Sequence, residues 1–235
     1  MSSQKSVIII PTYNEKDNVP QLTSQIFHFI PQTDILFIDD NSPDGTRQKI
    51  KELQKNNPHL YLLERPQKMG LGSAYITGFK WALEHHYDFI FEMDADLSHQ
   101  PKYLPKFLEA AKTHDLVLGS RYIPGGGVEN WNLFRRLLSR GGSLYSRFWL
   151  RLPYKDLTGG FKCFRSQVLK SLNLDSVRAE GYCFQVELTF RAHQKGFKIA
   201  EVPIIFPERT HGKSKISRKI VLEALWKVPL LYFRS

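Results

Sequence analysis

Two aspartates, Asp94 and Asp96, come directly after an apolar run at residues 89–93. Such a run predicts a buried parallel strand, and open α/β sheets bind ligands at the carboxyl ends of their strands. Two carboxylates this close repel each other unless a cation or a proton lies between them. Their oxygens suit Mg²⁺ or Mn²⁺, which usually keep several waters and bridge to substrate phosphates. Taken alone, the pair fits a metal site, or a solvated loop or helix cap, equally well.

A second acidic block, residues 39–46, follows another apolar run at residues 35–38. Its Asn, Ser, Pro, Asp and Gly residues are typical of a turn. Because the carboxyl ends of parallel strands meet at one edge of a sheet, the loops that hold Asp40 and Asp94 can share one crevice. The Gly-x-Gly pattern at residues 70–72 lacks the third glycine of a dinucleotide fingerprint and does not follow a strand directly, which argues against a Rossmann oxidoreductase.

The elements that would carry these loops alternate between strand and helix along the first half of the chain. Short apolar runs predict five strands, and the segments between them have the periodicity of helices. This alternation is typical of an α/β fold with a doubly wound, mainly parallel sheet flanked by helices. The predicted strands are residues 6–10, 35–38, 60–63, 89–93 and 116–118.

The second half of the chain is basic and partly amphipathic. Five arginines interleave with Leu, Phe, Trp and Tyr at residues 133–152, which predicts a basic amphipathic helix. Within it, Gly141 and Gly142 predict a break or a close approach. Residues 215–235 are a second basic and apolar segment, interrupted at Pro229. Both segments fit a membrane surface or simple packing on the sheet, and the second fits docking on a partner equally well. A strand at 161–164, a helix at 184–196 and a strand near 199–205 complete the predicted elements.

The composition, with 42% hydrophobic and 24% charged residues among 235, is that of a soluble globular protein. Nothing in the sequence marks a linker, so we expect a single domain over residues 1–235. Two cysteines form no disulfide framework, which favours a reducing, cytosolic setting. No apolar run is long enough for a transmembrane helix, and the first residues do not resemble a signal peptide.

The net charge of +10 is unevenly spread along the chain. Residues 1–120 hold 12 Lys or Arg and 15 Asp or Glu (−3), whereas residues 121–235 hold 21 and 8 (+13). Such asymmetry predicts an anionic partner for the second half: nucleic acid, an acidic membrane or phosphate groups. A basic nucleic-acid-binding protein would leave Asp40, Asp94 and Asp96 without a purpose, and no helix-turn-helix, zinc or RNA-recognition signature supports it.

Six motifs stand in a fixed order along nearly the whole chain. They are Pro11-Thr-Tyr-Asn-Glu15, Asp39-Asp-Asn-Ser-Pro-Asp-Gly-Thr46, Asp94-Ala-Asp96, Gly119-Ser-Arg-Tyr122, Thr158-Gly-Gly-Phe-Lys162 and Arg209-Thr-His-Gly-Lys-Ser-Lys215. In this order they resemble the polyprenyl-phosphate (dolichol-phosphate) mannose synthases of glycosyltransferase family 2. The resemblance implies a GT-A fold and transfer of mannose from GDP-mannose to the phosphate of a polyprenyl phosphate, with inversion. The loop at residues 41–46 favours mannose synthases over the related glucosyl transferases, which leaves transfer from UDP-glucose or another UDP-sugar as the alternative.

The resemblance also assigns roles by position. The guanosine part would meet five residues, which are Pro11, Tyr13, Glu15, Ile38 and Asp40. Asp94 and Asp96 would bind Mg²⁺ or Mn²⁺ and the diphosphate, with Ala95 lining the pocket. Ser98 stands where many relatives have Gln as a further metal ligand, so the third ligand is Ser98, water or His99.

The remaining implied roles concern the acceptor and the closing of the donor site. Arg121, Arg135 and Ser139 match positions expected to receive the acceptor phosphate, for which the planar arginine fork is suited because it binds phosphate through two hydrogen bonds. Arg209 and Lys215 match residues expected to close over the donor diphosphate. Asp96, Arg121 and Arg209 are the expected catalytic residues. No general base is required, because the acceptor phosphate is already anionic.

The resemblance divides the single domain into a nucleotide-sugar half at about residues 1–120, an acceptor part at about 121–215 and a basic C-terminal helix at about 216–235. A polyprenyl phosphate stays in a membrane, so we expect a peripheral enzyme at the cytoplasmic face of a membrane, without a transmembrane segment of its own. Lys and Arg near an acidic surface contribute roughly 1 kcal/mol each. The expected partners are GDP-mannose, the lipid phosphate and the membrane surface, but not nucleic acid. The chain either binds the bilayer itself or is recruited by a small membrane-protein subunit. A basic membrane-binding protein without enzymatic activity is the remaining alternative.

Overall fold

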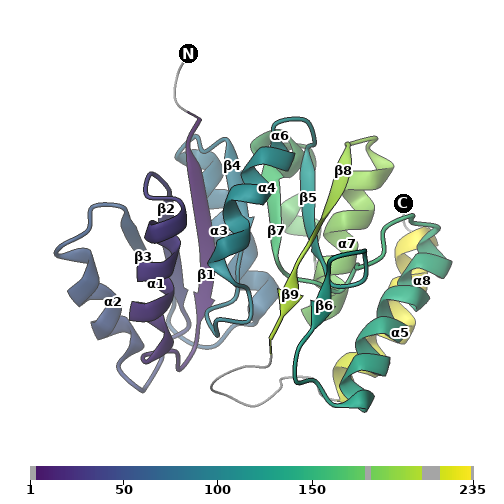
Figure 1. The fold of residues 1–235 in the computed structure, drawn as a ribbon, viewed down its shortest axis with the longest axis horizontal. Coiled ribbons are helices and arrows are strands. Elements are labelled where there is room, and N and C mark those ends of the chain that lie inside the picture. Colours follow the sequence, from purple (N-terminus) through teal and green to yellow (C-terminus); the bar gives the residue numbers. More distant parts are fainter. Residues whose placement is uncertain (1–3, 178–180, 208–217, 234–235) are drawn as a thin grey trace.

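A seven-stranded sheet forms the centre of the protein in the computed structural model (Figure 1). The structure describes residues 4–177, 181–207 and 218–233, with the backbone alone at 218–224. The strands lie in the order β3-β2-β1-β4-β7-β5-β8, and β7 alone among them runs antiparallel to its neighbours. This confirms the mainly parallel, doubly wound α/β sheet. The strands are β1 (Ser6–Thr12), β2 (Asp34–Asp39), β3 (Leu60–Glu64), β4 (Phe89–Glu92), β5 (Leu116–Ser120), β7 (Lys162–Arg165) and β8 (Ile199–Pro203).

Helices cover both faces of this sheet. The helices α1, α2 and α4 pack on one face, and α3, α6 and α7 pack on the other. Along β1, Val7 and Ile9 face the layer of α3 and α7, whereas Ile8 and Ile10 face the layer of α1 and α4. Because both faces are covered, the strand is a continuous apolar run. The helices are α1 (Asn18–Phe29), α2 (Thr46–Gln54), α3 (Leu71–Glu84), α4 (Leu104–Ala111), α6 (Ser166–Ser171) and α7 (Gly181–Gln194), with 3₁₀ turns at Pro101–Tyr103 and Leu174–Ser176.

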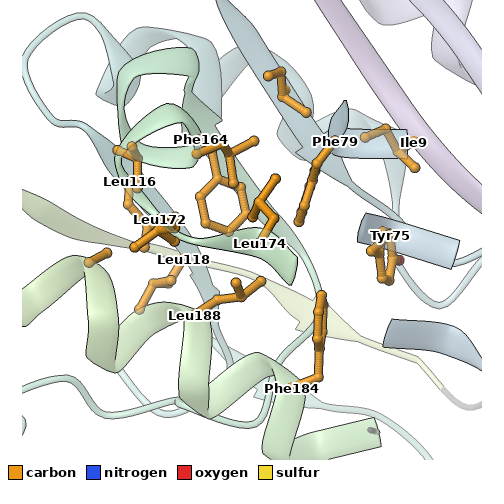
Figure 2. Close-up of a cluster of buried hydrophobic side chains, with 14 of the residues drawn as sticks. Ile9, Tyr75, Phe79, Leu116, Leu118, Phe164, Leu172, Leu174, Phe184 and Leu188 are labelled. Atoms are coloured by element: carbon orange, nitrogen blue, oxygen red, sulfur yellow. The ribbon is translucent and has the colours of Figure 1, made fainter. Parts of the chain in front are cut away.

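The core between the sheet and the α3/α7 layer is rich in aromatic rings (Figure 2). Tyr75 stacks between Phe79 and Phe184, with ring centroids 6.2 and 6.0 Å away. At Gly78, α3 approaches the sheet so closely that an added Cβ would lie 2.6 Å from Ile9 Cγ2. The absence of a side chain at this glycine therefore lets α3 lie directly on β1, beside the edge where the predicted donor residues are located.

Two further helices, α5 (Leu133–Leu150) and α8 (Arg218–Phe233), lie side by side at the right of Figure 1. A short parallel ribbon of β6 (Gly127–Val128) and β9 (Ile205–Phe206) lies near the carboxyl ends of the central strands. No helix in the described part of the chain is long and apolar enough to cross a membrane.

The structure corrects two predictions about these helices. A break at Gly141 and Gly142 is wrong, because α5 continues through both residues. An interruption at Pro229 is also wrong, because α8 runs through it. Proline has no N–H, so the carbonyl of Leu225 four residues earlier loses its helical partner. The hydroxyl of Tyr145 in α5 donates to this carbonyl at 2.9 Å and replaces the missing hydrogen bond.

Candidate active site

The two acidic loops lie at the same edge of the sheet. Strands β2 and β4 flank β1 and run parallel to it, so the loops that follow them project from one side. Asp40 follows β2 directly, and Asp94 comes two residues after β4. The topology thus brings together the two acidic motifs that are 54 positions apart in the chain. This edge is where doubly wound sheets bind ligands.

Asp40 is buried and held in place by the segment that follows β3. Arg65 Nε donates to one carboxylate oxygen at 2.5 Å, and the N–H of Met69 donates to the other at 3.1 Å. The remaining nitrogens of Arg65 donate to Ser73 Oγ at 2.9 Å and to the carbonyl of Gly70 at 3.1 Å. Sequence reasoning missed Arg65, although a lone arginine one residue after a strand was a visible signal. The loop that begins at Arg65 therefore forms a rigid wall beside Asp40.

The other predicted nucleotide residues occupy different environments along this edge. Tyr13 is half-buried, and the ammonium of Lys68 lies over its ring at 4.2 Å from the centroid. Glu15 is half-buried in the turn before α1, and Pro11 is half-buried within β1. Ile38 is fully buried against α3, so it has no exposed atom with which to meet a ligand in this arrangement. The predicted contact of Ile38 with the nucleotide stays a prediction.

The loop after β4 holds both predicted metal ligands in a tight set of hydrogen bonds. Ser98 donates to Asp96 Oδ1 through its N–H at 3.1 Å and its hydroxyl at 2.5 Å. The N–H of Asp94 donates to His99 Nδ1 at 2.9 Å, so the proton of a neutral imidazole lies on Nε2. This Nε2 is 4.0 Å from Asp94 Oδ2. On the other side, the hydroxyl of Tyr75 donates to Asp94 Oδ1 at 3.4 Å.

The oxygens offered by this loop fit a hard divalent cation that takes its other ligands from elsewhere. Within the described ranges, no three His, Cys, Asp or Glu side chains gather closely enough to hold a metal ion on their own. Two carboxylates match the usual Mg²⁺ arrangement, in which waters and substrate phosphates complete the octahedron. The hydroxyl of Ser98 is buried and donates to Asp96. The Nδ1 lone pair of the buried His99 already accepts from the N–H of Asp94, and its Nε2 presents a proton toward the Asp94 carboxylate. Ser98 as the third ligand stays a prediction.

A buried acidic residue and a buried basic residue are paired in register beneath this loop, and sequence reasoning missed them. Glu92 is paired with Lys162 across β4 and β7, and both are almost completely buried. Lys162 donates to the carbonyl of Gln185 at 2.6 Å and to Thr189 Oγ1 at 3.0 Å, which ties the strand to α7. Burial raises the pKa of Glu92 to about 8, and it lowers the pKa of Lys162 to about 8, in each case against the attraction of the other group. A charged residue at the end of the apolar run 89–93 was the available signal.

Arg121, predicted to receive the acceptor phosphate, already has a carboxylate partner. Asp156 accepts hydrogen bonds from Nε at 2.6 Å and from Nη2 at 2.7 Å, and Thr158 Oγ1 accepts a second one from Nη2 at 3.0 Å. The bidentate edge of the guanidinium is therefore occupied by protein. The rings of Trp131 and Phe206 enclose the group, with centroids 5.6 and 5.5 Å from Cζ. The prediction that this fork binds phosphate through two hydrogen bonds does not fit this arrangement.

The other two acceptor candidates lie close to Arg121. Ser139 Oγ accepts a hydrogen bond from the hydroxyl of Tyr122, the next residue after Arg121, at 2.7 Å. The guanidinium of Arg135 stacks on the ring of Trp131 at 3.9 Å, and Trp131 also faces Arg121. The structure thus brings the three predicted acceptor residues around one group of aromatic rings.

An apolar pocket of about 510 Å³ adjoins this group. Ser139 and Thr158, which contact Tyr122 and Arg121, also line the pocket. The pocket lies between α5, α7 and α8, and apolar side chains form most of its wall. The lining residues are Phe134, Leu137, Leu138, Ser139, Gly141, Gly142, Tyr145, Ser146, Thr158, Tyr182, Cys183, Val186, Leu225 and Val228. Sequence reasoning did not predict this pocket, because it depends on how three distant helices pack.

The helices α5 and α8 also expose large apolar residues to solvent. Phe134 and Phe148 of α5 are 75% and 77% exposed, and Trp226 of α8 is 76% exposed. Exposed arginines accompany them on α5 and just beyond its end, which are Arg136, Arg140 and Arg151. Monomeric soluble proteins rarely expose so many large apolar groups together, and such patches mark interaction sites. Arg209 and Lys215, predicted to close over the donor, lie outside the described residues.

The sequence and the fold both resemble known glycosyltransferases. The chain is 47% identical to an undecaprenyl-phosphate mannosyltransferase of Micrococcus luteus, over 94% of this chain and 90% of that protein. It is 45% identical to a polyprenol monophosphomannose synthase of Mycolicibacterium smegmatis, over 96% of this chain and 86% of that protein.

Solved structures share the fold at low sequence identity. Glucosyl-3-phosphoglycerate synthase of Mycobacterium tuberculosis, solved with Mn²⁺ and UDP, superimposes with a TM-score of 0.69 at 17% identity, over 95% of this chain and 80% of that one. A mannosyltransferase of Pyrobaculum calidifontis, solved with GDP-mannose and Mn²⁺, superimposes with a TM-score of 0.60 at 18% identity, over 91% of this chain and 59% of that one. These matches confirm the GT-A fold. The sequence model of glycosyl transferase family 2 matches residues 7–172, and with the relatives above it shows that the chain belongs to this family, among its polyprenyl-phosphate mannose synthases.

Proposed function

We propose that this enzyme transfers mannose from GDP-mannose to the phosphate of a polyprenyl phosphate. The observation that carries the proposal is the adjacency of three features: the acidic loop after β4, the Arg121 group after β5, and the apolar pocket that shares Ser139 and Thr158 with that group. The ring of Phe206 links the first two, because its centroid is 5.4 Å from that of His99 in the acidic loop and 5.5 Å from Arg121 Cζ. A nucleotide diphosphate, a phosphate and an isoprenoid chain would each meet matching chemistry. The names of the relatives from Micrococcus and Mycolicibacterium support the same acceptor.

The donor would lie along the carboxyl edge of β1, β2 and β4. We assign the guanosine to Tyr13 and Asp40, beside the loop that begins at Arg65, and the diphosphate to Asp94 and Asp96. Mg²⁺ or Mn²⁺ bound there would neutralise the charge that grows on the departing diphosphate. The Pyrobaculum structure, which holds GDP-mannose and Mn²⁺ on the same fold, supports this choice of donor and ion class. Two rigid contacts, Arg65 on Asp40 and Ser98 on Asp96, keep these carboxylates oriented before the donor arrives.

The acceptor phosphate would lie near Arg121, Arg135 and Ser139. One of its oxygens attacks C1 of the mannose, the bond from C1 to the diphosphate breaks, and the electron pair leaves with GDP. Attack from the opposite side inverts the configuration. The phosphate is already ionised at neutral pH, so no side chain has to remove a proton. Arg209 and Lys215 remain our candidates for closing over the diphosphate, where positive charge stabilises the leaving group.

The isoprenoid chain would enter the pocket between α5, α7 and α8. The exposed aromatic residues and arginines of α5 and α8 are suited to the interface of an anionic bilayer. We therefore propose that the enzyme works peripherally at a membrane, at its cytoplasmic face. In the alternative, recruitment by a small membrane-protein subunit, the subunit would bind the same face. Flotation with liposomes tests this: a Phe134→Ser and Trp226→Ser double variant should float less than the wild type with anionic vesicles. Equal flotation of the two proteins would contradict the membrane proposal.

The transfer itself is tested with radiolabelled GDP-mannose, undecaprenyl phosphate and Mn²⁺ or Mg²⁺. We expect a lipid-extractable product that disappears with EDTA and falls by about a hundredfold or more in Asp96→Asn, because the variant weakens the stabilisation of the leaving diphosphate. Asp88→Asn is the matched control, because Asp88 lies just before the opposite end of the same strand and, within the described ranges, its carboxylate accepts from the N–H of Lys5 alone, at 2.9 Å. Full activity of Asp96→Asn, or no lipid product from the wild type, would contradict the proposal.

A further inference from the structure

Asp156 holds the guanidinium of Arg121 along one edge. Its Oδ2 accepts from the backbone N–H of Arg121 at 3.0 Å and from Nε at 2.6 Å, and its Oδ1 accepts from Nη2 at 2.7 Å. Thr158 Oγ1 accepts from Nη2 at 3.0 Å. A guanidinium has five N–H donors, of which these contacts engage those on Nε and Nη2. Within the described chain, the Nη1 hydrogens have no hydrogen-bond acceptor and remain for a ligand.

The carboxylate that holds Arg121 is itself fixed. Asp156 is 1% exposed, and its N–H donates to Glu201 Oε1 at 3.0 Å. Burial alone would raise the pKa of Asp156, but Arg121 outweighs it and keeps that pKa below its usual range. Burial would likewise lower the pKa of Arg121, but Asp156 outweighs it and raises the pKa. Both groups therefore stay ionised at neutral pH, and the guanidinium cannot turn without breaking a buried ion pair.

We propose that Asp156 is a positioning residue that restrains Arg121 so that it meets the acceptor phosphate through Nη1 alone. This inference rests on the proposed function, in which Arg121 contacts that phosphate. A free arginine fork would bind phosphate through two parallel hydrogen bonds. Such binding would stabilise the acceptor before the reaction. An interaction that is as strong in the ground state as in the transition state does not accelerate the transfer. With its other edge held, Arg121 donates to one phosphate oxygen and leaves another oxygen for attack on the sugar.

Thr158 connects this restraint to the apolar pocket. Its hydroxyl accepts from Arg121 and lies 3.3 Å from Ser143 Oγ of α5. Its methyl group lies 3.5 Å from where a Cβ at Gly142 would be, and the residue lines the pocket. The side chain that limits the freedom of Arg121 is thus also part of the wall that the acceptor chain would touch. The head and the tail of the acceptor would therefore be aligned by one short segment, residues 156–158.

The test is a double-mutant cycle of Asp156→Asn and Arg121→Met, with kcat and KM measured for both substrates. The amide keeps the size of Asp156 but releases the guanidinium, which can then bind the phosphate through two hydrogen bonds. We therefore expect an unchanged or lower KM for undecaprenyl phosphate and a kcat about tenfold lower, because the acceptor oxygen is no longer aligned. Arg121→Met should raise the acceptor KM about tenfold. In the Arg121→Met background, Asp156→Asn should change neither constant by more than about twofold.

Two results would overturn the proposal. One is an Asp156→Asn variant in which the KM values of both substrates rise together with a fall in kcat, as general loss of structure predicts. The other is a double variant whose losses multiply, because a residue that acts through Arg121 has no effect without it. Asp34→Asn is the matched control: this carboxylate also accepts from two side chains, Tyr87 at 2.6 Å and His59 at 2.6 Å, but lies at the amino end of β2. It should keep wild-type constants.

Two further measurements keep the proposal testable if the first variants fail. If Asp156→Asn does not fold, Thr158→Val removes one contact to Nη2 without stranding a charge, and kcat should fall about threefold, whereas the control Asp34→Asn should match the wild type. An equal kcat in the wild type, Thr158→Val and Asp34→Asn would overturn the proposal that Arg121 is restrained in this way. If the wild type transfers no mannose, the proposed function fails, and calorimetric binding of farnesyl phosphate then tests the restraint alone. Asp156→Asn should bind it as tightly as the wild type or more tightly, and weaker binding would overturn the inference.

Discussion

The hydroxyl of Tyr145 should stabilise the packing of α5 on α8 by replacing a hydrogen bond that Pro229 removes. Replacing Tyr145 with Phe deletes only this hydroxyl and leaves the carbonyl of Leu225 without its 2.9 Å donor. A neutral hydrogen bond contributes about 0.5–1.5 kcal/mol to folding. Leu225 is 45% exposed, so water can reach the carbonyl, and we expect a loss in the lower half of that range, about 0.5–1 kcal/mol. For a chain of this length, 1 kcal/mol corresponds to about 2–4 °C in Tm.

The Pro229→Ala background identifies the cause of this loss. Alanine restores the N–H that can donate to the carbonyl of Leu225 within α8, so the hydroxyl of Tyr145 is no longer needed there. Thermal and urea unfolding of the four proteins should therefore show that Tyr145→Phe costs less in the Pro229→Ala background than in the wild type. An equal cost in both backgrounds, or no cost in the wild type, would refute the reasoning.

Three further predictions follow from burial, charge and packing. Gly78→Ala should destabilise the fold by about 1–3 kcal/mol in urea unfolding, because its Cβ would lie 2.6 Å from Ile9, whereas Gly141→Ala, with nothing within 4 Å, should stabilise α5 by up to about 1 kcal/mol. The folded-state pKa of Asp156 lies below its unfolded value, so its contribution to stability is present above about pH 4 and lost as the pH falls through the folded pKa. In acid unfolding, the Asp156→Asn variant should therefore lose less stability than the wild type as the pH falls below about 4. The same pH dependence of stability in both proteins would contradict this prediction. Val186→Phe narrows the pocket and should raise the KM for undecaprenyl phosphate while leaving the Kd of GDP unchanged; a change in the GDP affinity alone would contradict the assignment.

The sheet was predictable because its strands are buried on both faces and therefore appear as apolar runs. The antiparallel direction of β7 was not predictable. An apolar run such as residues 161–164 does not indicate which way a strand runs, and the direction of β7 depends on its pairing with β4 and β5. The same limit applies to the helices. A glycine pair and a proline predict breaks locally, but α5 and α8 continue because packing between them, including the Tyr145 hydroxyl, compensates.

The acidic edge of the site was predictable from the sequence, because Asp40 and Asp94 each follow an apolar run. Their supporting contacts were not, because Arg65 reaches Asp40 from 25 positions away and Asp156 reaches Arg121 from 35. Residues so far apart in the sequence form no local motif from which the contact could be predicted. Glu92 was within the apolar run itself, where a single acidic residue is easily overlooked, and its register with Lys162 depends on how β4 and β7 pair.

The most direct test of the central claim is a comparison of donors with one purified preparation and undecaprenyl phosphate as the acceptor. GDP-mannose and UDP-glucose, each radiolabelled in the sugar, are supplied with Mn²⁺, and the label in the lipid extract is measured. We predict mannose in the extract as an acid-labile lipid phosphate, at a rate at least about a hundredfold above that of glucose, since Asp40 would read the guanine base and a missed polar contact costs several orders of magnitude. Equal rates with both donors, or no mannose in the lipid extract, would contradict the account.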